Sequence, residues 1–370
     1  MEFSISKSEL LTGLYLSQGI VERRTTIPIL SNVLLEAAGS TLTISATDQE
    51  IGVRRACTAK VKKPGTVTAS ARKLYEMARE FPEGEISISG KDNNWIEVKA
   101  GRGHFRLVGL DPREFPEMPK ATADGARLAV KVSADALSHM LELTSFAISS
   151  DETRMSLNGI LIEGTEDGQL RIVATDGHRL AMISRPVEGA STGSSVILPR
   201  KAVAELRKIL ESDENDIDLI VGDGVAYVMR GPVEMSMRLI EGEFPDYNQV
   251  LPKKSTKIAK VDAAALLAGL RRVSIMSSER TKGVKLDLEK GRLELSTINP
   301  DIGEGTEEVE VDYDGAPVNV GFNARYLMDI LSVLPSDAVV EVGLNDEVSP
   351  GVIRIEGDPE YRYIVMPMRL

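Results

Sequence analysis

The chain has 370 residues, of which 42% are hydrophobic and 27% are charged, and its formal net charge is −12. This length exceeds what a single core usually holds and predicts two or three domains. No apolar run approaches the roughly 20 residues of a membrane span, and the first residues lack the basic and apolar stretches of a secretory signal. We therefore expect a cytoplasmic protein that is neither exported nor inserted into a membrane.

The lone cysteine, Cys57, agrees with a reducing compartment because it cannot form an internal disulfide. It lies in residues 54–59, which alternate like a strand, and no candidate base accompanies it. We predict a packed strand residue rather than a nucleophile.

One succession of a helix and two strands occurs three times along the chain. In the first copy, Leu10, Leu11 and Leu14 recur at helical spacing, and the residues that follow alternate like strands. The predicted helices span residues 6–21, 133–148 and 262–276. The predicted strands span residues 33–36, 42–48, 160–163, 170–176, 284–288 and 293–297.

A second helix and a second set of strands follow in each copy. The helices begin near Ala71, Pro199 and Ala324. Ser70 and Asn323 suit the N-cap position, and Pro199 suits the first helical position. The strands that come next span residues 85–89, 217–221 and 339–343.

Landmark residues give the first two copies a nearly constant offset. Asp176 follows Asp48 by 128 residues, and the Phe-Pro pair at Phe244 follows the pair at Phe115 by 129 residues. Such agreement predicts three homologous domains. We expect α+β domains with antiparallel sheets and two helices each, at residues 1–122, 128–252 and 257–370. Exposed sheet edges at both ends of such a chain favour head-to-tail pairing with a second copy, which could close a ring.

The basic residues of this acidic chain cluster around the repeated helices. If the domains are related by rotation, these residues share one surface that could attract duplex DNA without sequence preference. Charged helix faces that simply meet solvent are the open alternative. The residues are Lys7, Arg23, Arg24, Arg72, Lys73, Arg79, Arg154, Arg200, Lys201, Arg207, Lys208, Arg271, Arg272, Arg280, Lys282 and Arg325.

The segment Thr175–Leu180 combines an Asp-Gly turn with His178 and Arg179, which have no counterparts after Asp48. A hydrolase that uses Asp176 and His178 is one interpretation, but no histidine cluster, metal-ligand spacing or phosphate-binding loop accompanies them. Ligand or peptide binding is the interpretation that we favour. The apolar C-terminus, with Met366 and Met368, indicates either an adaptable binding surface or a last core strand.

Four motifs give the whole chain a resemblance to a known family. They are TDGHRL at 175–180, VMPMRL at 365–370, FPDY at 244–247 and PILSN at 28–32. Together they resemble the beta subunits of bacterial DNA polymerase III, the sliding clamps. The resemblance implies a ring-shaped homodimer that encircles DNA, with sheets outside and helices lining a central hole. It also implies tethering of the replicative polymerase, with no catalysis, cofactor or metal.

The resemblance further implies a pocket where short motifs of polymerases, the clamp loader and repair proteins dock. The family pattern has two aromatic residues at Met155-Ser156, an arginine at Gln249 and a serine at Pro350, so the chain departs from it there. The implied pocket residues are Leu157, Thr175, Gly177, His178, Arg179, Leu180, Pro245, Val250, Val348, Pro350, Ile364, Met366, Pro367, Met368 and Arg369.

Two more sets of residues follow from the resemblance. The implied DNA contacts are Arg24, Arg72, Arg200 and Lys201. The implied ring interface joins apolar and charged residues of the first domain to apolar and acidic residues of the third. Its residues are Lys73, Arg102, Phe105, Leu107, Ile275, Met276, Glu304, Glu307 and Glu308.

Overall fold

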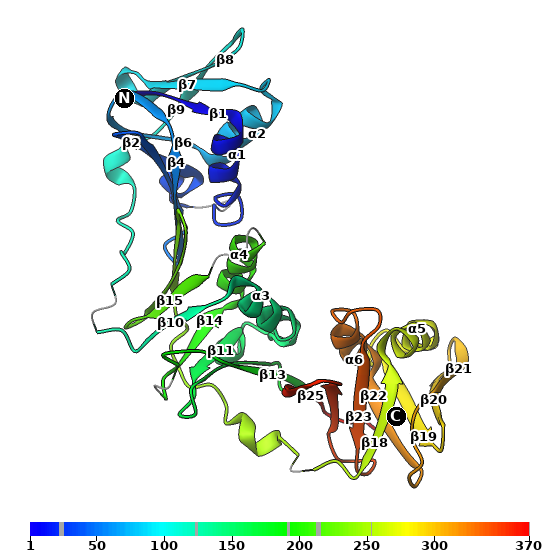
Figure 1. Cartoon of the computed structure of the whole chain (residues 1–370). Helices are drawn as coiled ribbons and strands as arrows, with labels where there is room; N and C mark the ends of the chain where they lie inside the picture. The colour runs from blue at the N-terminus through cyan, green and yellow to red at the C-terminus, as the bar shows by residue number, and fades with distance from the viewer. Residues whose placement is uncertain (22–25, 123–124, 191–192, 212–215, 253, 370) are drawn as a thin grey trace. The chain divides into compact units, whose positions relative to one another are not determined.

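The computed structural model describes residues 1–21, 26–122, 125–190, 193–211, 216–252 and 254–369 (Figure 1). Two compact units make up the chain. Unit 1 contains residues 1–138, 187–194 and 201–239, and unit 2 contains residues 139–186, 195–200 and 240–370.

Unit 1 has two antiparallel sheets. In spatial order, the five-stranded sheet contains β5 (Lys60–Lys63), β1 (Glu2–Ser6), β7 (Glu85–Gly90), β8 (Trp95–Ala100) and β9 (Gly103–Val108). The eight-stranded sheet contains β10 (Leu128–Val132), β15 (Ile217–Val221), β16 (Val225–Arg230), β17 (Val233–Arg238), β4 (Ile51–Thr58), β3 (Thr41–Thr47), β2 (Asn32–Ala38) and β6 (Gly65–Ser70).

Helices α1 (Lys7–Tyr15) and α2 (Ala71–Glu80) lie side by side in unit 1 (Figure 1). Apolar residues at helical spacing explain the packing, since Leu10, Leu14 and Leu74 are fully buried. The central repeat adds α3 (Ala134–Glu142) and α4 (Arg200–Leu210).

Unit 2 also has two antiparallel sheets. The eight-stranded sheet contains β14 (Ser195–Pro199), β11 (Gly159–Gly164), β12 (Gln169–Thr175), β13 (Arg179–Pro186), β25 (Asp358–Val365), β24 (Gly351–Ile355), β23 (Val339–Leu344) and β18 (Lys257–Asp262). The four-stranded sheet contains β21 (Gly303–Glu310), β20 (Arg292–Asn299), β19 (Gly283–Glu289) and β22 (Val318–Asn323). Helices α5 (Ala263–Val273) and α6 (Ala324–Leu331) pack against each other.

Strand pairing joins neighbouring repeats inside each unit. In unit 1, β17 of the central repeat pairs with β4 of the first, with Met235 opposite Val53. In unit 2, β13 of the central repeat pairs with β25 of the last, with Leu180 opposite Ile364. The boundaries of the two units are therefore set by strand pairing between repeats, and they do not coincide with the boundaries of the three repeats.

The predicted α+β class and antiparallel sheets are confirmed. The helix predicted at 6–21 was too long, because α1 ends at Tyr15, where the Leu14 carbonyl accepts from the Ser17 hydroxyl at 2.6 Å and from the Gln18 side chain at 3.1 Å. The predictions for 133–148 and 262–276 likewise included short 3-10 turns that follow α3 and α5.

N-cap predictions have mixed outcomes. The side chains of Ser70 and Asn323 accept hydrogen bonds from the first turns of α2 and α6, as predicted. Pro199 is not the first helical residue, because it pairs with Gly159 as the last residue of β14. Among the described residues, no helix is long and apolar enough to cross a membrane.

Candidate peptide-binding groove

A small apolar cavity opens on unit 2 beside the turn between β12 and β13. It encloses about 130 Å³, close to the roughly 150 Å³ of an apolar cavity that accepts a benzene ring. We call it the unit 2 groove. Its lining residues are Leu157, Thr175, Gly177, Arg179, Leu180, Pro245, Asp246, Tyr247, Val250, Ile364 and Met366.

The turn at the rim of the groove is held by its own aspartate. Asp176 Oδ1 accepts hydrogen bonds from the backbone N–H groups of His178 and Arg179, at 2.9 and 3.1 Å. Gly177 has φ +87°, and a Cβ there would lie 2.9 Å from the Arg154 guanidinium. The turn therefore requires glycine and presents a fixed backbone to the cavity.

Arg179 supports the groove from below. Its side chain is 8% exposed, forms ion pairs with Asp176 at 3.1 Å and Asp329 at 2.5 Å, and donates to the Phe146 carbonyl at 2.7 Å. The guanidinium also lies 4.5 Å from the centre of the Tyr326 ring. Because every arm of Arg179 has a partner within unit 2, the residue orients the groove walls.

The pKa of Arg179 is raised above its ordinary value. Burial lowers it, but interactions with Tyr363 and Asp329 raise it by more. Arg179 is therefore always positively charged, and its charge is neutralised by the carboxylates of Asp176 and Asp329.

The segment from Pro245 to Val250 forms the other wall. It contains η6 (Tyr247–Val250), and the Tyr247 hydroxyl donates to Glu163 at 2.7 Å and accepts from Arg171 at 3.0 Å. Burial raises the pKa of Tyr247, so the phenol stays protonated and can donate. These bonds fasten the segment to the face of β11 and β12.

Part of the expected pocket set lies outside the cavity lining. His178 is exposed and stacks on Tyr326 with 6.3 Å between ring centres, and Val348 is 67% exposed in the loop before β24. The Met368 backbone N–H donates to the Gly321 carbonyl of β22 at 2.8 Å. The expected residues that do not line the cavity are His178, Val348, Pro350, Pro367, Met368 and Arg369.

The hydrolase alternative finds no support in this geometry. Both carboxylate oxygens of Asp176 are engaged by backbone N–H groups and by Arg179, so Asp176 does not orient the His178 ring. Within the described ranges, no three His, Cys, Asp or Glu side chains could hold a metal ion.

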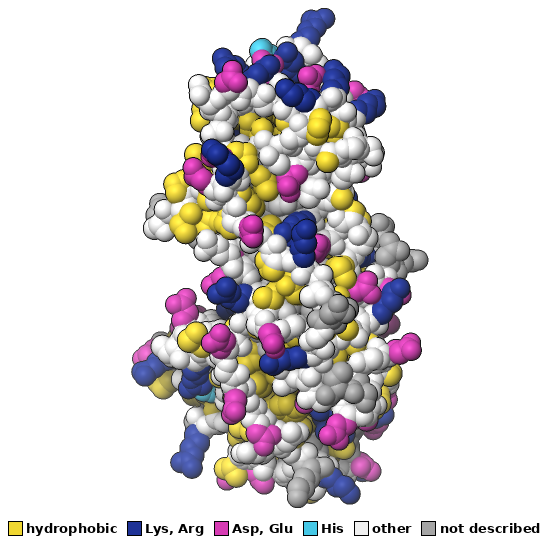
Figure 2. Space-filling view, turned by 90° about the vertical axis from the view of Figure 1, so that its left-hand side faces the viewer, with side chains coloured by type: hydrophobic (Ala, Val, Ile, Leu, Met, Phe, Trp, Pro, Cys, Tyr) yellow, Lys and Arg dark blue, Asp and Glu magenta, His cyan; other side chains and the backbone are white. Residues whose placement is uncertain are grey.

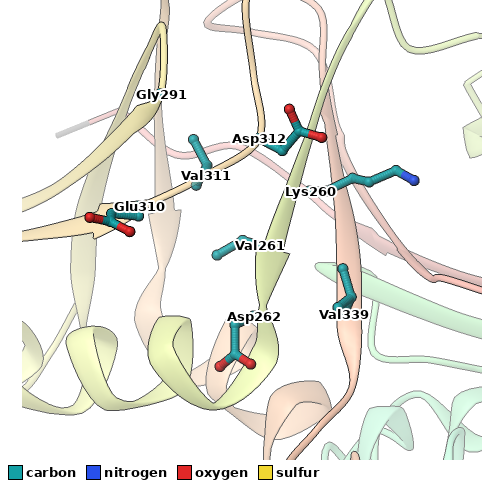
Figure 3. A pocket seen from close by; sticks show the side chains of 8 residues that line it. All are labelled: Lys260, Val261, Asp262, Gly291, Glu310, Val311, Asp312 and Val339. Atoms are coloured by element: carbon teal, nitrogen blue, oxygen red, sulfur yellow. The ribbon is translucent and has the colours of Figure 1, made fainter.

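A larger cavity on unit 2, of about 590 Å³, lies among the ends of β18, β21 and β23 (Figure 3). Asp262 in its wall already caps α5, and the Lys260 side chain extends away from the other lining residues (Figure 3) to pair with Glu356 at 2.6 Å. It lacks the continuous apolar lining of the unit 2 groove.

Three family models cover almost the entire chain. They describe the N-terminal, central and C-terminal domains of the DNA polymerase III beta subunit and match residues 1–119, 121–246 and 248–369. A beta sliding clamp of Caulobacter vibrioides is 39% identical over the full length of both chains. The chain belongs to the family of DNA polymerase III beta subunits, the beta sliding clamps.

Solved clamps share the fold along the whole chain. A Pseudomonas aeruginosa clamp bound to griselimycin has a TM-score of 0.95 and 35% identity, with both chains fully covered. A Caulobacter crescentus clamp, with polyethylene glycol at its proposed beta-motif tethering region, has a TM-score of 0.92 and 39% identity over the same full coverage. As a beta sliding clamp, the chain is a processivity subunit of DNA polymerase III and not an enzyme.

The basic residues expected at DNA in this sliding clamp have different surroundings. Arg72 and Arg200 are exposed at the starts of α2 and α4. Arg72 shares Glu76 with Lys73, at 2.7 and 3.0 Å. Lys201 instead forms an ion pair with the buried Asp48 of unit 1. Arg24 lies outside the described residues.

Five of the residues expected at the ring interface lie on two edge strands, Phe105 and Leu107 on β9 and Glu304, Glu307 and Glu308 on β21, whereas Lys73 is in α2, Arg102 is in the turn before β9, and Ile275 and Met276 are in a 3-10 turn. Strand β9 is the last strand of the five-stranded sheet, and β21 is the last strand of the four-stranded sheet. Phe105 on β9 is 43% exposed, and Ile275, in the 3-10 turn after α5, is 74% exposed. Sequence reasoning missed Ile298 and Ile302, which are exposed next to β21.

Charges of opposite sign occupy these two edges of the clamp. The β8–β9 hairpin carries exposed Arg102 and Arg106, and Lys and Arg side chains gather at the upper end of Figure 2, where this hairpin lies. Strand β21 carries Glu304, Glu307 and Glu308. Glu307 already pairs with Arg272 at 2.7 Å, and Glu308 with Arg292 at 3.3 Å.

Proposed function

We propose that two copies of this clamp pair head to tail into a ring that encircles duplex DNA. Strand β9 of one copy adds to β21 of the other, so that the two sheets continue into each other. Arg102 and Lys73 face Glu304, Glu307 and Glu308, while Phe105 and Leu107 meet Ile275 and Met276. One heterologous contact, made twice by twofold symmetry, then closes the assembly.

The observation that carries this proposal is the complementarity of the two edges. Each presents an unpaired strand, β9 beside exposed arginines and β21 with glutamates. Complementary charges set the pairing and disfavour association of like edges. Large apolar side chains beside each edge, Phe105 and Ile275 among them, supply surface to bury.

Binding to DNA in this proposal depends on topology more than on affinity. Arg72 and Arg200 are exposed and would attract phosphates of any sequence. Because the net charge of the chain is −12, the rest of its surface does not attract DNA phosphates strongly. A ring with these properties stays on circular DNA because the DNA has no free end over which the ring could leave. The ring can still slide along the duplex.

Loading on circular and linear DNA tests the proposal. Rings loaded on nicked circles by a clamp loader should survive a high-salt wash and leave after the circle is cut, whereas an electrostatic binder leaves both forms. Equal retention on circles and linear fragments would rule out encirclement. A native mass equal to one chain would rule out the dimer.

We further propose that the unit 2 groove binds short peptide motifs of DNA polymerases, the clamp loader and repair proteins. Its apolar lining suits an aliphatic or aromatic anchor, and its fixed backbone rim suits the polar atoms of an extended peptide. We propose it as the counterpart of the region that holds polyethylene glycol in the Caulobacter crescentus clamp. His178, Val348, Pro350, Pro367, Met368 and Arg369 would contact flanking parts of the motif.

The proposed domain limits are residues 1–122, 128–252 and 257–370, with each domain one copy of the repeat. The cytoplasm, where bacterial replication takes place, is the compartment that we propose for the assembly.

A further inference from the structure

We propose that unit 1 contains a second peptide-binding site, which takes a segment with an arginine or lysine beside an aliphatic or aromatic residue. The site is a cavity of about 740 Å³, within the roughly 300–1,000 Å³ of typical ligand pockets. We call it the unit 1 groove. Its lining residues are Leu34, Glu36, Ser45, Arg54, Phe115, Pro116, Glu117, Met118, Lys120, Ala121, Met229 and Glu234.

The unit 1 groove is built like the unit 2 groove. In both, the segment that follows a repeat lies over one face of an eight-stranded sheet, with Phe115 and Phe244 at matching positions. Both phenylalanines pack in apolar clusters with residues of that segment and of the sheet. The repeat therefore creates a candidate groove twice, once in each unit.

The floor of the unit 1 groove is one cross-strand row. Leu34 pairs with Ser45, Ser45 with Arg54, Arg54 with Glu234, and Glu234 with Met229. Directly opposed residues of neighbouring strands point to the same face of a sheet, so all five side chains face the cavity.

The first three positions of the corresponding row of unit 2 are apolar, and the row then continues to Arg362, which pairs with Met182. There Leu161 pairs with Val173, and Val173 pairs with Met182. Ser45 thus stands where unit 2 has valine, and Arg54 stands where it has methionine. The two grooves therefore suit different ligands.

Met118 explains why the unit 1 cavity lies over the polar row. A Cβ at Gly52 would lie 2.5 Å from the Met118 methyl group, so the methionine rests directly on this glycine. The matching position in unit 2 is Leu180, which itself lines the unit 2 groove. Met118 fills the first apolar position from above, and the open space shifts along the sheet to Ser45 and Arg54.

Arg54 fixes the wall of the groove and is not available to a ligand. Its two terminal nitrogens donate to the carbonyls of Pro119 and Met118, at 3.1 and 2.6 Å, and to Glu234 at 3.2 Å. The bonds hold residues 118–119 in place as a rigid rim.

The buried hydroxyl group of Ser45 points to a bound ligand. The residue is 1% exposed, and among the described residues its hydroxyl oxygen has no hydrogen-bond partner. A buried hydroxyl without a partner costs free energy, and such groups are rare in native proteins. Because Ser45 lines the cavity, a polar atom of a bound peptide can supply the missing bond.

Charge selects the class of peptide. Glu234 and Arg54 of the lining form an ion pair with each other, which leaves the exposed carboxylates of Glu36 and Glu117 against Lys120. An arginine or lysine of the peptide meets these carboxylates, and a neighbouring aliphatic or aromatic side chain meets Leu34, Phe115 and Met229. The same charges disfavour an acidic peptide.

The test uses the full-length clamp with methyl-labelled methionines and the probe acetyl-Leu-Arg-Phe-amide, with acetyl-Leu-Glu-Phe-amide as the matched probe. Met118 and Met229 line the unit 1 groove, whereas Met366 lines the unit 2 groove and Met182 packs in the apolar cluster beside it, so the two pairs report on different sites. We expect the arginine probe to shift the Met118 and Met229 methyl resonances and the glutamate probe to leave them in place.

Two variants locate the binding. Ser45→Val copies the unit 2 residue, and Glu234→Gln keeps an acceptor for Arg54 but removes the charge. Each should weaken the affinity of the arginine probe about fivefold, while the exposed control Glu50→Gln leaves it unchanged. The proposal is overturned if only Met182 and Met366 respond, if no methionine responds at about 5 mM probe, or if Ser45→Val and Glu234→Gln bind as the wild type does.

Discussion

Lys201, at the start of α4, forms an ion pair with Asp48, whose carboxylate is almost fully buried in the turn after β3. The other oxygen of Asp48 accepts the backbone N–H groups of Glu50 and Ile51, at 2.9 and 2.6 Å. Asp176, its counterpart in the next repeat, holds its own turn in the same way but takes its cation from Arg179. The repeated aspartate thus holds a cation in both units, a half-buried lysine in unit 1 and a buried arginine in unit 2.

Replacing Lys201 with methionine should lower the free energy of unfolding of the clamp. It should weaken DNA binding only slightly, because the Lys201 ammonium is paired with Asp48. The change leaves the buried Asp48 carboxylate without its cation, and we expect a loss of about 1–3 kcal/mol in the free energy of unfolding. Urea unfolding measures it. Lys131→Met, which removes an exposed pair with Asp216, should cost under about 0.5 kcal/mol; equal losses in the two variants would contradict the structural role.

Arg179→Met should destabilise unit 2 by about 3–5 kcal/mol, because it leaves the carboxylates of Asp329 and Asp176 without their cation and removes a buried donor to the Phe146 carbonyl. Arg179→Lys should recover only part of this loss, since an ammonium cannot reproduce the planar fork. Thermal unfolding of the full chain is the measurement. Arg154→Met, at an exposed pair with Asp151, is the control, and complete rescue by lysine would refute the role of the fork.

Met366→Asp should weaken binding of a motif peptide at the unit 2 groove about tenfold or more, because it places a charge in an apolar lining. Met368→Asp is the matched comparison and should weaken binding less, since Met368 lies outside the cavity lining and would meet only a flanking part of the motif. Fluorescence anisotropy with a labelled peptide from a clamp-binding polymerase gives both affinities. If Met368→Asp were the more damaging change, the peptide would lie elsewhere.

Ile275→Asp should convert the proposed ring into single chains. Ile275 is 74% exposed in one chain, so the substitution does little to the folded monomer but buries a carboxylate at the proposed contact with β9. Analytical ultracentrifugation measures the mass, and Met155→Asp, at a 68% exposed residue that lies on neither edge strand, should remain dimeric. A dimeric Ile275→Asp protein with unchanged stability would exclude this interface.

Cys57 should resist thiol reagents until the clamp unfolds. It is 1% exposed, and burial raises the pKa of its thiol, so less thiolate is present at pH 8 than in an ordinary cysteine. Ellman's reagent should react with one thiol per chain in guanidinium chloride and with almost none in buffer. Rapid labelling of the native protein would contradict the burial.

The sequence predicted the repeated elements well because they depend on local patterns. The offset between Asp48 and Asp176 identified two turns that have the same hydrogen bonds. Alternation placed three strands in each repeat, and the C-terminal motif proved to continue from a core strand, β25, in which Tyr361 and Tyr363 are fully buried.

Tertiary partners were beyond prediction from local patterns. Nothing in the spacing indicated that Lys201 would be used by Asp48 of another repeat, or that β13 would pair with β25. Asp246 and Tyr247 were missed as lining residues although the FPDY motif contained the signal. A tyrosine beside a proline that must pack over a sheet requires a partner for its hydroxyl, and Glu163 provides it.

The pairing of β13 with β25 has a consequence for biosynthesis. Strand β13 is complete once Pro186 has left the ribosome, but its neighbour in the sheet begins only at Asp358, 172 residues later (358 − 186). Until then the nascent central repeat exposes an unpaired edge with the apolar Leu180 and Met182 on it. A premature stop codon anywhere between these strands would leave an incomplete, aggregation-prone product that chaperones or proteases must clear.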